Sequence, residues 1–90
     1  VQGGIVFGLS AALFGEITLA NGQVQQSGFK DYRLARMRDV PQIDVHLVSS
    51  DRHPTGVGES AVPPIAPAIA NAIYAASGNA VRDLPIGRTV

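Results

Sequence analysis

The residues best suited to chemistry stand together in the run Gly56-Val57-Gly58-Glu59. Two glycines one residue apart let a ligand lie against the backbone where a Cβ would block it. A carboxylate next to such a turn can act as a general base on a bound molecule. A simpler interpretation is also open, because an acidic residue near a helix N-terminus gains about 0.3–1 kcal/mol from the helix dipole.

Two helices are predicted from the spacing of apolar residues. The first covers residues 3–14 and ends at Gly15. The second covers residues 64–77, with a continuous stripe of isoleucine and alanine. Pro67 lacks an amide hydrogen and fits only the first helical turn, and Gly78 can supply a left-handed cap. The Gly56–Gly58 turn therefore lies just ahead of the second helix.

The rest of the chain predicts extended structure. Asn21-Gly22 between alternating segments is typical of a two-residue β-hairpin. Residues 43–49 alternate between apolar and polar side chains and predict a third, antiparallel strand. Residues 28–40 predict an irregular connection, and residues 81–86 a short extended tail. We expect an α+β fold in which two helices pack on a small antiparallel sheet of about three strands that contains the hairpin.

Composition excludes several classes of function. Seven basic and seven acidic residues give no net charge, so we expect neither nucleic acid nor an anionic membrane surface as a partner. The absence of cysteine excludes disulfides, thiolate zinc sites and iron–sulfur clusters within the chain, but leaves the compartment open. The longest apolar stretches are shorter than the roughly 18 residues of a membrane-spanning helix.

We expect the 90 residues to form one domain or part of one. The sequence starts at Val1, without methionine and directly before an apolar pattern, so we interpret it as a fragment of a longer chain. Hydrophobic residues make up 46% and charged residues 16%, which is more apolar surface than so small a core can bury. An isolated fragment is therefore expected to self-associate.

Other constellations favour structural roles. His46 and His53 lack the spacing of a paired metal site, and we interpret them as surface histidines. The run from Gly8 to Ala12 only approaches a serine nucleophile elbow and lies in a helical pattern, so we reject that function. The basic residues of the connection are interpreted as a solvated face. The alternative is that they contact a cofactor phosphate or a neighbouring domain. They are Arg33, Arg36 and Arg38.

A resemblance decides between the two interpretations of Glu59. The run Gly56-Val57-Gly58-Glu59, the proline–alanine segment at residues 63–73 and the glycine-rich start at residues 2–13 resemble the end of the molybdopterin-binding subunit of the xanthine dehydrogenase and aldehyde oxidase family. The likeness covers nearly the whole chain and is greatest for the branch with isoquinoline 1-oxidoreductase beta subunits. Ser60 departs from the proline that is usual there, which leaves the turn less rigid.

The resemblance implies a molybdenum hydroxylase. Glu59 would be the base that takes a proton from a hydroxyl on the molybdenum, while an aldehyde or N-heteroaromatic carbon is hydroxylated with oxygen from water. The backbone at Thr55, Gly56, Val57 and Gly58 would line the molybdenum–molybdopterin cofactor, with no direct metal ligand from this chain. The implied partners are the remainder of the large subunit and a small subunit or domain that carries iron–sulfur clusters. The isolated chain is expected to be inactive.

A second hypothesis belongs to another class of protein. The apolar faces of both helices would form a subunit interface in a non-catalytic interaction module. Glu59 would then be only an acidic residue at the N-terminus of the second helix.

Overall fold

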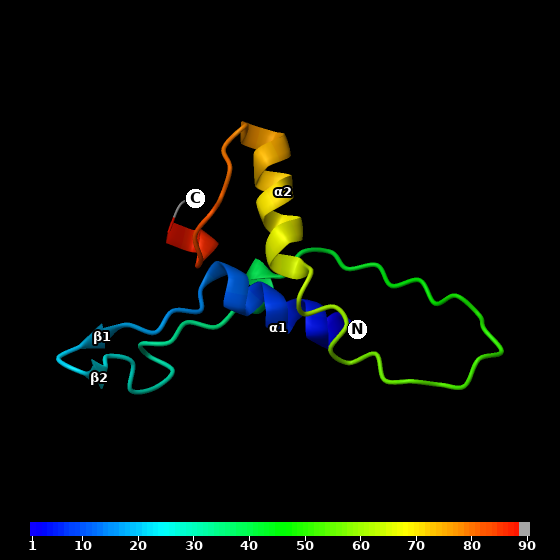
Figure 1. Ribbon diagram of the computed structural model, residues 1–90, viewed down its shortest axis with the longest axis horizontal. Coiled ribbons are helices and arrows are strands. Elements are labelled where there is room, and N and C mark those ends of the chain that lie inside the picture. The colour runs from blue at the N-terminus through cyan, green and yellow to red at the C-terminus, as the bar shows by residue number, and fades with distance from the viewer. Residues whose placement is uncertain (89–90) are drawn as a thin grey trace.

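A computed structural model describes residues 1–88 of the chain. Helix α1 (Gln2–Leu13) and helix α2 (Ile65–Ser77) cross at the centre of the molecule, as Figure 1 shows. Strands β1 (Leu19–Ala20) and β2 (Gln23–Val24) form a hairpin to one side. Two single-turn 3-10 helices, η1 (Met37–Asp39) and η2 (Ile86–Arg88), complete the elements.

Helix α1 begins and ends within one residue of the predicted bounds. Val1 is its N-cap, and the Val1 carbonyl accepts the Ile5 amide at 3.0 Å without help from a side-chain cap. The helix buries Gly8, Leu9 and Ala12, which the 3.6-residue period brings to one face. The amides of Phe14 and Gly15 close its last turn on Ser10 and Ala11, so Gly15 marks its end as predicted.

Helix α2 is also confirmed by the structure. Pro64 is its N-cap, and Pro67 occupies the third helical position, where its missing N–H would have had no partner inside the helix. Gly78 ends the helix with a left-handed φ of 76°, and its N–H donates to the Tyr74 carbonyl at 2.8 Å. Local sequence therefore fixed both ends of this element.

The hairpin forms at the predicted turn. Asn21 and Gly22 both take positive φ, 52° and 73°, as a two-residue turn with the twist of its strands requires. Leu19 pairs with Val24 in an antiparallel register. Gln26 extends the ladder with its side chain, since its Oε1 accepts the Thr18 amide at 2.8 Å.

The fold class is confirmed as helices with a small antiparallel sheet, but two details of the prediction are wrong. Within residues 1–88 the sheet has two strands, and residues 43–49 form no strand. Those residues lie on the opposite side of α1 from the hairpin (Figure 1) and have no strand beside them to pair with. The helices also pack on each other, while the hairpin projects away from them. The predicted tail at residues 81–86 forms no strand and leads into η2.

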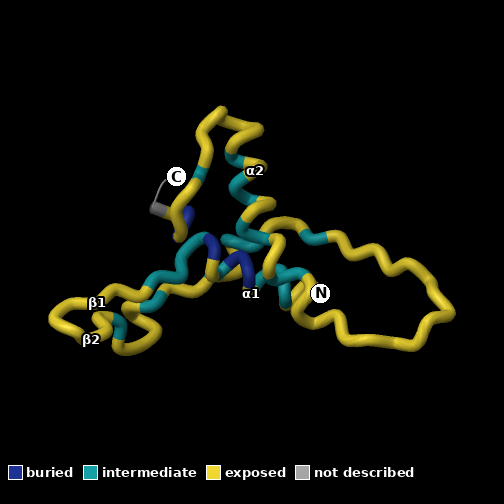
Figure 2. The backbone as a smooth tube through the Cα atoms, in the orientation of Figure 1, coloured by how far each residue is buried: buried dark blue, intermediate teal, exposed yellow. Residues whose placement is uncertain are grey.

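The core is very small. Leu9, Ala12 and Ile86 are the buried hydrophobic side chains of the described part, and Figure 2 shows burial confined to α1 and the segment that returns to it. The radius of gyration is 16.0 Å, against about 12 Å for a compact chain of this length. The accessible surface is 7338 Å², against roughly 5000 Å² expected from the mass. The chain thus covers little of its own apolar surface.

None of the helices in residues 1–88 has the length and apolar character needed to cross a membrane.

Leu9→Ala should unfold the 90-residue chain. Leu9 is 6% exposed, and a buried leucine truncated to alanine costs about 2–5 kcal/mol. A core this small supplies little more than that, so we expect most of the helical circular dichroism to disappear. Leu47→Ala is the matched control, because Leu47 is 88% exposed and should change stability by less than about 0.5 kcal/mol. Equal urea midpoints for the two variants would contradict this core.

Candidate functional site

Glu59 lies in a turn that joins the long connection of residues 40–57 to helix α2. The Val62 N–H donates to the Glu59 carbonyl at 2.9 Å and closes this turn. Helix α2 begins only at Ile65, and its first turn contains no acidic residue and no side-chain cap. Glu59 therefore lies ahead of α2, and the segment between it and Ile65 contains two prolines.

The Glu59 side chain is exposed and has no hydrogen-bond or ion-pair partner among residues 1–88. An acidic side chain that stabilised the local fold would accept a hydrogen bond from the turn or from a nearby cation. This carboxylate does neither.

Thr55, Gly56, Val57 and Gly58 are all exposed and lead directly into the Glu59 turn. An added Cβ at Gly56 or Gly58 would meet nothing within 4 Å. Neither glycine has positive φ, so the local backbone conformation does not require glycine. The backbone at these two glycines is open to close approach.

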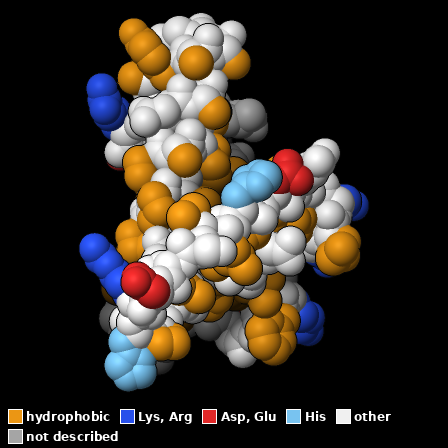
Figure 3. Space-filling model, turned by 90° about the vertical axis from the view of Figure 1, so that its right-hand side faces the viewer, with side chains coloured by type: hydrophobic (Ala, Val, Ile, Leu, Met, Phe, Trp, Pro, Cys, Tyr) orange, Lys and Arg blue, Asp and Glu red, His pale blue; other side chains and the backbone are white. Residues whose placement is uncertain are grey.

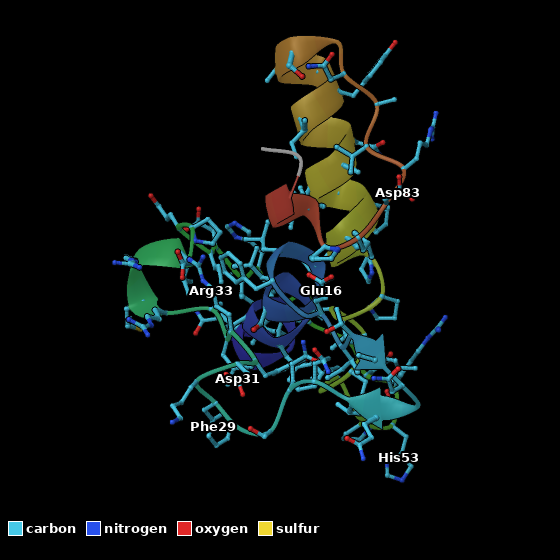
Figure 4. All side chains as sticks on the ribbon, turned by 90° about the vertical axis from the view of Figure 1, so that its left-hand side faces the viewer. Glu16, Phe29, Asp31, Arg33, His53 and Asp83 are labelled. Atoms are coloured by element: carbon cyan, nitrogen blue, oxygen red, sulfur yellow. The ribbon has the colours of Figure 1, made fainter. Side chains whose placement is uncertain are left out.

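The described residues cannot hold a metal ion by themselves. No group of three histidine, cysteine, aspartate or glutamate side chains comes together anywhere in residues 1–88. His46 and His53 are exposed as predicted, and Figure 4 shows His53 at the periphery, away from the helices. Any metal beside Glu59 would need its ligands from a cofactor or from other protein.

The basic connection has a structural role at Arg33. Its guanidinium lies over the Phe14 ring, 3.8 Å from the centroid, and 3.8 Å from an Asp39 carboxylate oxygen (Figure 4 labels Arg33). Arg36 and Arg38 are exposed, as a solvated face would be. The stacking on Phe14 could not be seen from the sequence, because nothing in the spacing of residues 14 and 33 indicates contact.

Ser10 confirms the rejection of a serine nucleophile. It lies inside α1, and its Oγ accepts the Ala35 amide at 2.9 Å. This bond attaches the connection to the helix, so the hydroxyl is already committed to the fold.

Two residues that were not predicted to matter, Gly4 and Gly8, bring the Glu59 turn close to α1. Gly4 and Gly8 lie on one face of the helix, and residues 58–65 pass across that face. An ideal Cβ at Gly4 would be 2.8 Å from the Gly58 carbonyl oxygen, and one at Gly8 would be 2.9 Å from the Val62 carbonyl oxygen. The spacing of two glycines four residues apart in a helix was visible in the sequence and indicates a close backbone approach.

Much of the apolar surface of the chain is without cover. Phe7 is 72% exposed, Met37 88% and Val48 91%. Hydrophobic side chains are spread over the face of the molecule seen from the side of the long connection (Figure 3). Contiguous apolar surface of this kind marks contact with other protein.

Comparison with known proteins shows the class to which the chain is related. The chain is homologous to the molybdenum-binding large subunits of the xanthine dehydrogenase and aldehyde oxidase family, the molybdenum hydroxylases. The resemblance predicted from the sequence is confirmed. No family model matches the chain.

Three relatives illustrate the homology. The isoquinoline 1-oxidoreductase subunit beta of Brevundimonas diminuta is 44% identical over 86 residues, which cover 96% of this chain and 11% of that protein. A membrane-bound aldehyde dehydrogenase of Gluconacetobacter polyoxogenes, whose name gives pyrroloquinoline quinone, is 33% identical over 94% of this chain and 11% of its own length. A putative xanthine dehydrogenase molybdenum-binding subunit of Escherichia coli K12 is 32% identical over 96% and 12%. The chain thus spans about a tenth of these relatives.

Limited trypsin digestion of the 90-residue chain should cut first after Arg52. This residue lies in the exposed connection, which has no regular structure, so the backbone can enter a protease without unfolding the core. Arg33 serves as the internal reference, since stacking on Phe14 and the Asp39 ion pair hold it to α1. Mass spectrometry of early fragments measures both sites. Cleavage after Arg33 and after Arg52 at the same rate would contradict the prediction, because it would show that the segment around Arg52 is no more accessible than the one around Arg33.

Proposed function

We propose that this chain is part of the molybdopterin-binding domain of a molybdenum hydroxylase, with Glu59 as the general base. The observation that carries the proposal is the unpartnered Glu59 carboxylate beside a glycine backbone that is open on the side a Cβ would occupy. Homology to subunits named as molybdenum-binding supports it. The first turn of α2 contains no acidic residue, which favours this role for Glu59 over that of a helix-terminal acid.

The roles of the residues follow from their positions. When bound, the molybdenum–molybdopterin cofactor supplies the redox chemistry, in which the substrate carbon loses two electrons and gains oxygen from water. The open backbone at Gly56 and Gly58, with Thr55 and Val57 beside it, forms one wall against that cofactor. A Glu59 Oε atom accepts the proton of the water-derived oxygen as it attacks the electron-poor carbon, which requires a heavy-atom distance of about 2.6–3.2 Å.

The substrate class and the partners follow from the same proposal. Relatives are named for oxidation of isoquinoline, of aldehydes and of xanthine, so an aldehyde or N-heteroaromatic substrate fits. Because the chain has no cysteine, the iron–sulfur clusters that remove the electrons belong to another subunit or domain. The exposed apolar faces of both helices would be covered by the remainder of the large subunit.

The interaction-module hypothesis explains the exposed apolar surface equally well. The enzyme hypothesis assigns a role to the exposed Glu59 carboxylate and to the open backbone at Gly56 and Gly58, whereas the module hypothesis assigns them none. We therefore favour the enzyme.

Glu59→Gln in the complete, assembled enzyme separates these hypotheses. The amide keeps the size of the side chain but cannot take up a proton, so kcat should fall by about 100-fold or more. Molybdenum content should stay unchanged, because Glu59 is not expected to hold the cofactor. Asp51→Asn, in the same exposed connection, is the matched control and should retain activity. Two results would favour the interaction module. One is full turnover by the Glu59→Gln variant, and the other is a variant that fails to assemble with its partner subunits.

Cofactor analysis tests the proposal independently. Metal analysis of the assembled enzyme should find molybdenum, and the purified 90-residue chain should bind none, since its described residues offer no ligand cluster. The Gluconacetobacter relative is named for pyrroloquinoline quinone, so the extracted cofactor should also be identified chemically. A quinone without molybdenum would overturn the proposal.

A further inference from the structure

The turn that carries Glu59 rests on helix α1 at two points. The first is the Gly58 carbonyl, which belongs to the peptide group that also contains the Glu59 nitrogen, and it faces Gly4. The second is the Val62 carbonyl, which faces Gly8. Val62 also donates its N–H to the Glu59 carbonyl at 2.9 Å. One support thus lies directly before Glu59 and the other at the residue that closes its turn.

We infer that Gly4 and Gly8 are positioning residues that set where the Glu59 carboxylate stands. This inference rests on the proposed role of Glu59 as the base. Glu59 itself makes no side-chain contact that would hold it within residues 1–88, so its location is determined by the backbone of its turn. The position of that backbone is set by its close approach to Gly4 and Gly8 of α1.

The distances show how sensitive this arrangement is. An alanine Cβ at Gly4 would lie 2.8 Å from the Gly58 oxygen, whereas ordinary contact begins at 3.4 Å. The nearest atom at each position is a backbone carbonyl oxygen, which cannot rotate away as the end of a flexible side chain can. The turn must therefore retreat by about half an ångström, which is nearly the whole width of the 2.6–3.2 Å window for proton transfer.

The cost of glycine to helix stability supports the view that Gly4 and Gly8 are there to permit the close approach of residues 58–65. Glycine in a helix interior costs about 1 kcal/mol relative to alanine, so α1 is weakened at both positions. Gly3 provides the comparison within the same helix, because a Cβ there would meet nothing within 4 Å. Alanine at position 3 would gain helix propensity without touching the turn.

The test compares Gly4→Ala and Gly8→Ala with Gly3→Ala in the complete, assembled enzyme. Hydrogen exchange of peptides that cover residues 58–65 reports on the Val62 N–H, and steady-state kinetics normalised to bound molybdenum report on the base. For positions 4 and 8 we expect faster exchange of the Val62 amide. We also expect kcat per molybdenum lower by about ten-fold, since a 1 Å displacement can cost about 100-fold, with KM and molybdenum content unchanged. Gly3→Ala should match the wild type in every measurement.

Two results would overturn the inference. One is wild-type exchange and kcat in Gly4→Ala. The other is a variant with lower thermal stability or lower cofactor content but unchanged kcat per molybdenum. That result would show that the contact only stabilises the fold. If Gly8→Ala fails to fold, because its Cβ also meets Ile65 at 3.2 Å, Gly4→Ala decides alone, since its other neighbours lie at 3.5 Å or more. Glu59→Gln distinguishes the two proposals: if it inactivates the enzyme while Gly4→Ala does not, only the positioning role fails.

Discussion

The close approach of helix α1 to the backbone of residues 58–65 is the constraint on which the rest of this structure depends. It exists because Gly4 and Gly8 present no side chain, so carbonyl groups reach distances that a Cβ would forbid. The approach brings α2 against α1 and fixes the turn between the long connection and α2. Leu9 and Ala12 then become buried beside it. A contact between backbones thus creates the small core, and the side chains fill what remains.

A frame built in this way leaves most apolar side chains without cover. The hairpin and the long connection extend in opposite directions from the helices (Figure 1), and neither returns to shield them. Burial of apolar area is the main favourable term in folding, at about 25 cal/mol per Å², and this chain realises little of it. On our proposal the missing cover is the remainder of the large subunit, which would also supply the other walls of the cofactor site.

Local interactions made part of this fold predictable from the sequence. The Asn21-Gly22 turn and the Gly78 cap depend on backbone conformations that neighbouring residues dictate, and both formed as expected. Residues 43–49 show the limit, because their alternation predicts an extended segment with one covered face but does not supply the strand that would pair with it. Helix α2 begins one residue after the predicted start, so the position of Glu59 ahead of the helix was predictable from the sequence. Gly4 and Gly8 were missed because their contacts join residues more than fifty positions apart.

The glycines of this chain differ in what their positions require. Gly22 and Gly78 have positive φ, and Gly4 and Gly8 face backbone atoms that a Cβ would strike. Gly56 and Gly58 satisfy neither condition, for their φ is ordinary and the space beside them is open. Gly3 and Gly28 share these two properties, so an open glycine does not by itself identify a ligand. On our proposal, the cofactor is the molecule that approaches Gly56 and Gly58. On the same proposal, the Glu59 carboxylate next to them, which has no hydrogen-bond or ion-pair partner in the described residues, acts on a substrate bound beside that cofactor.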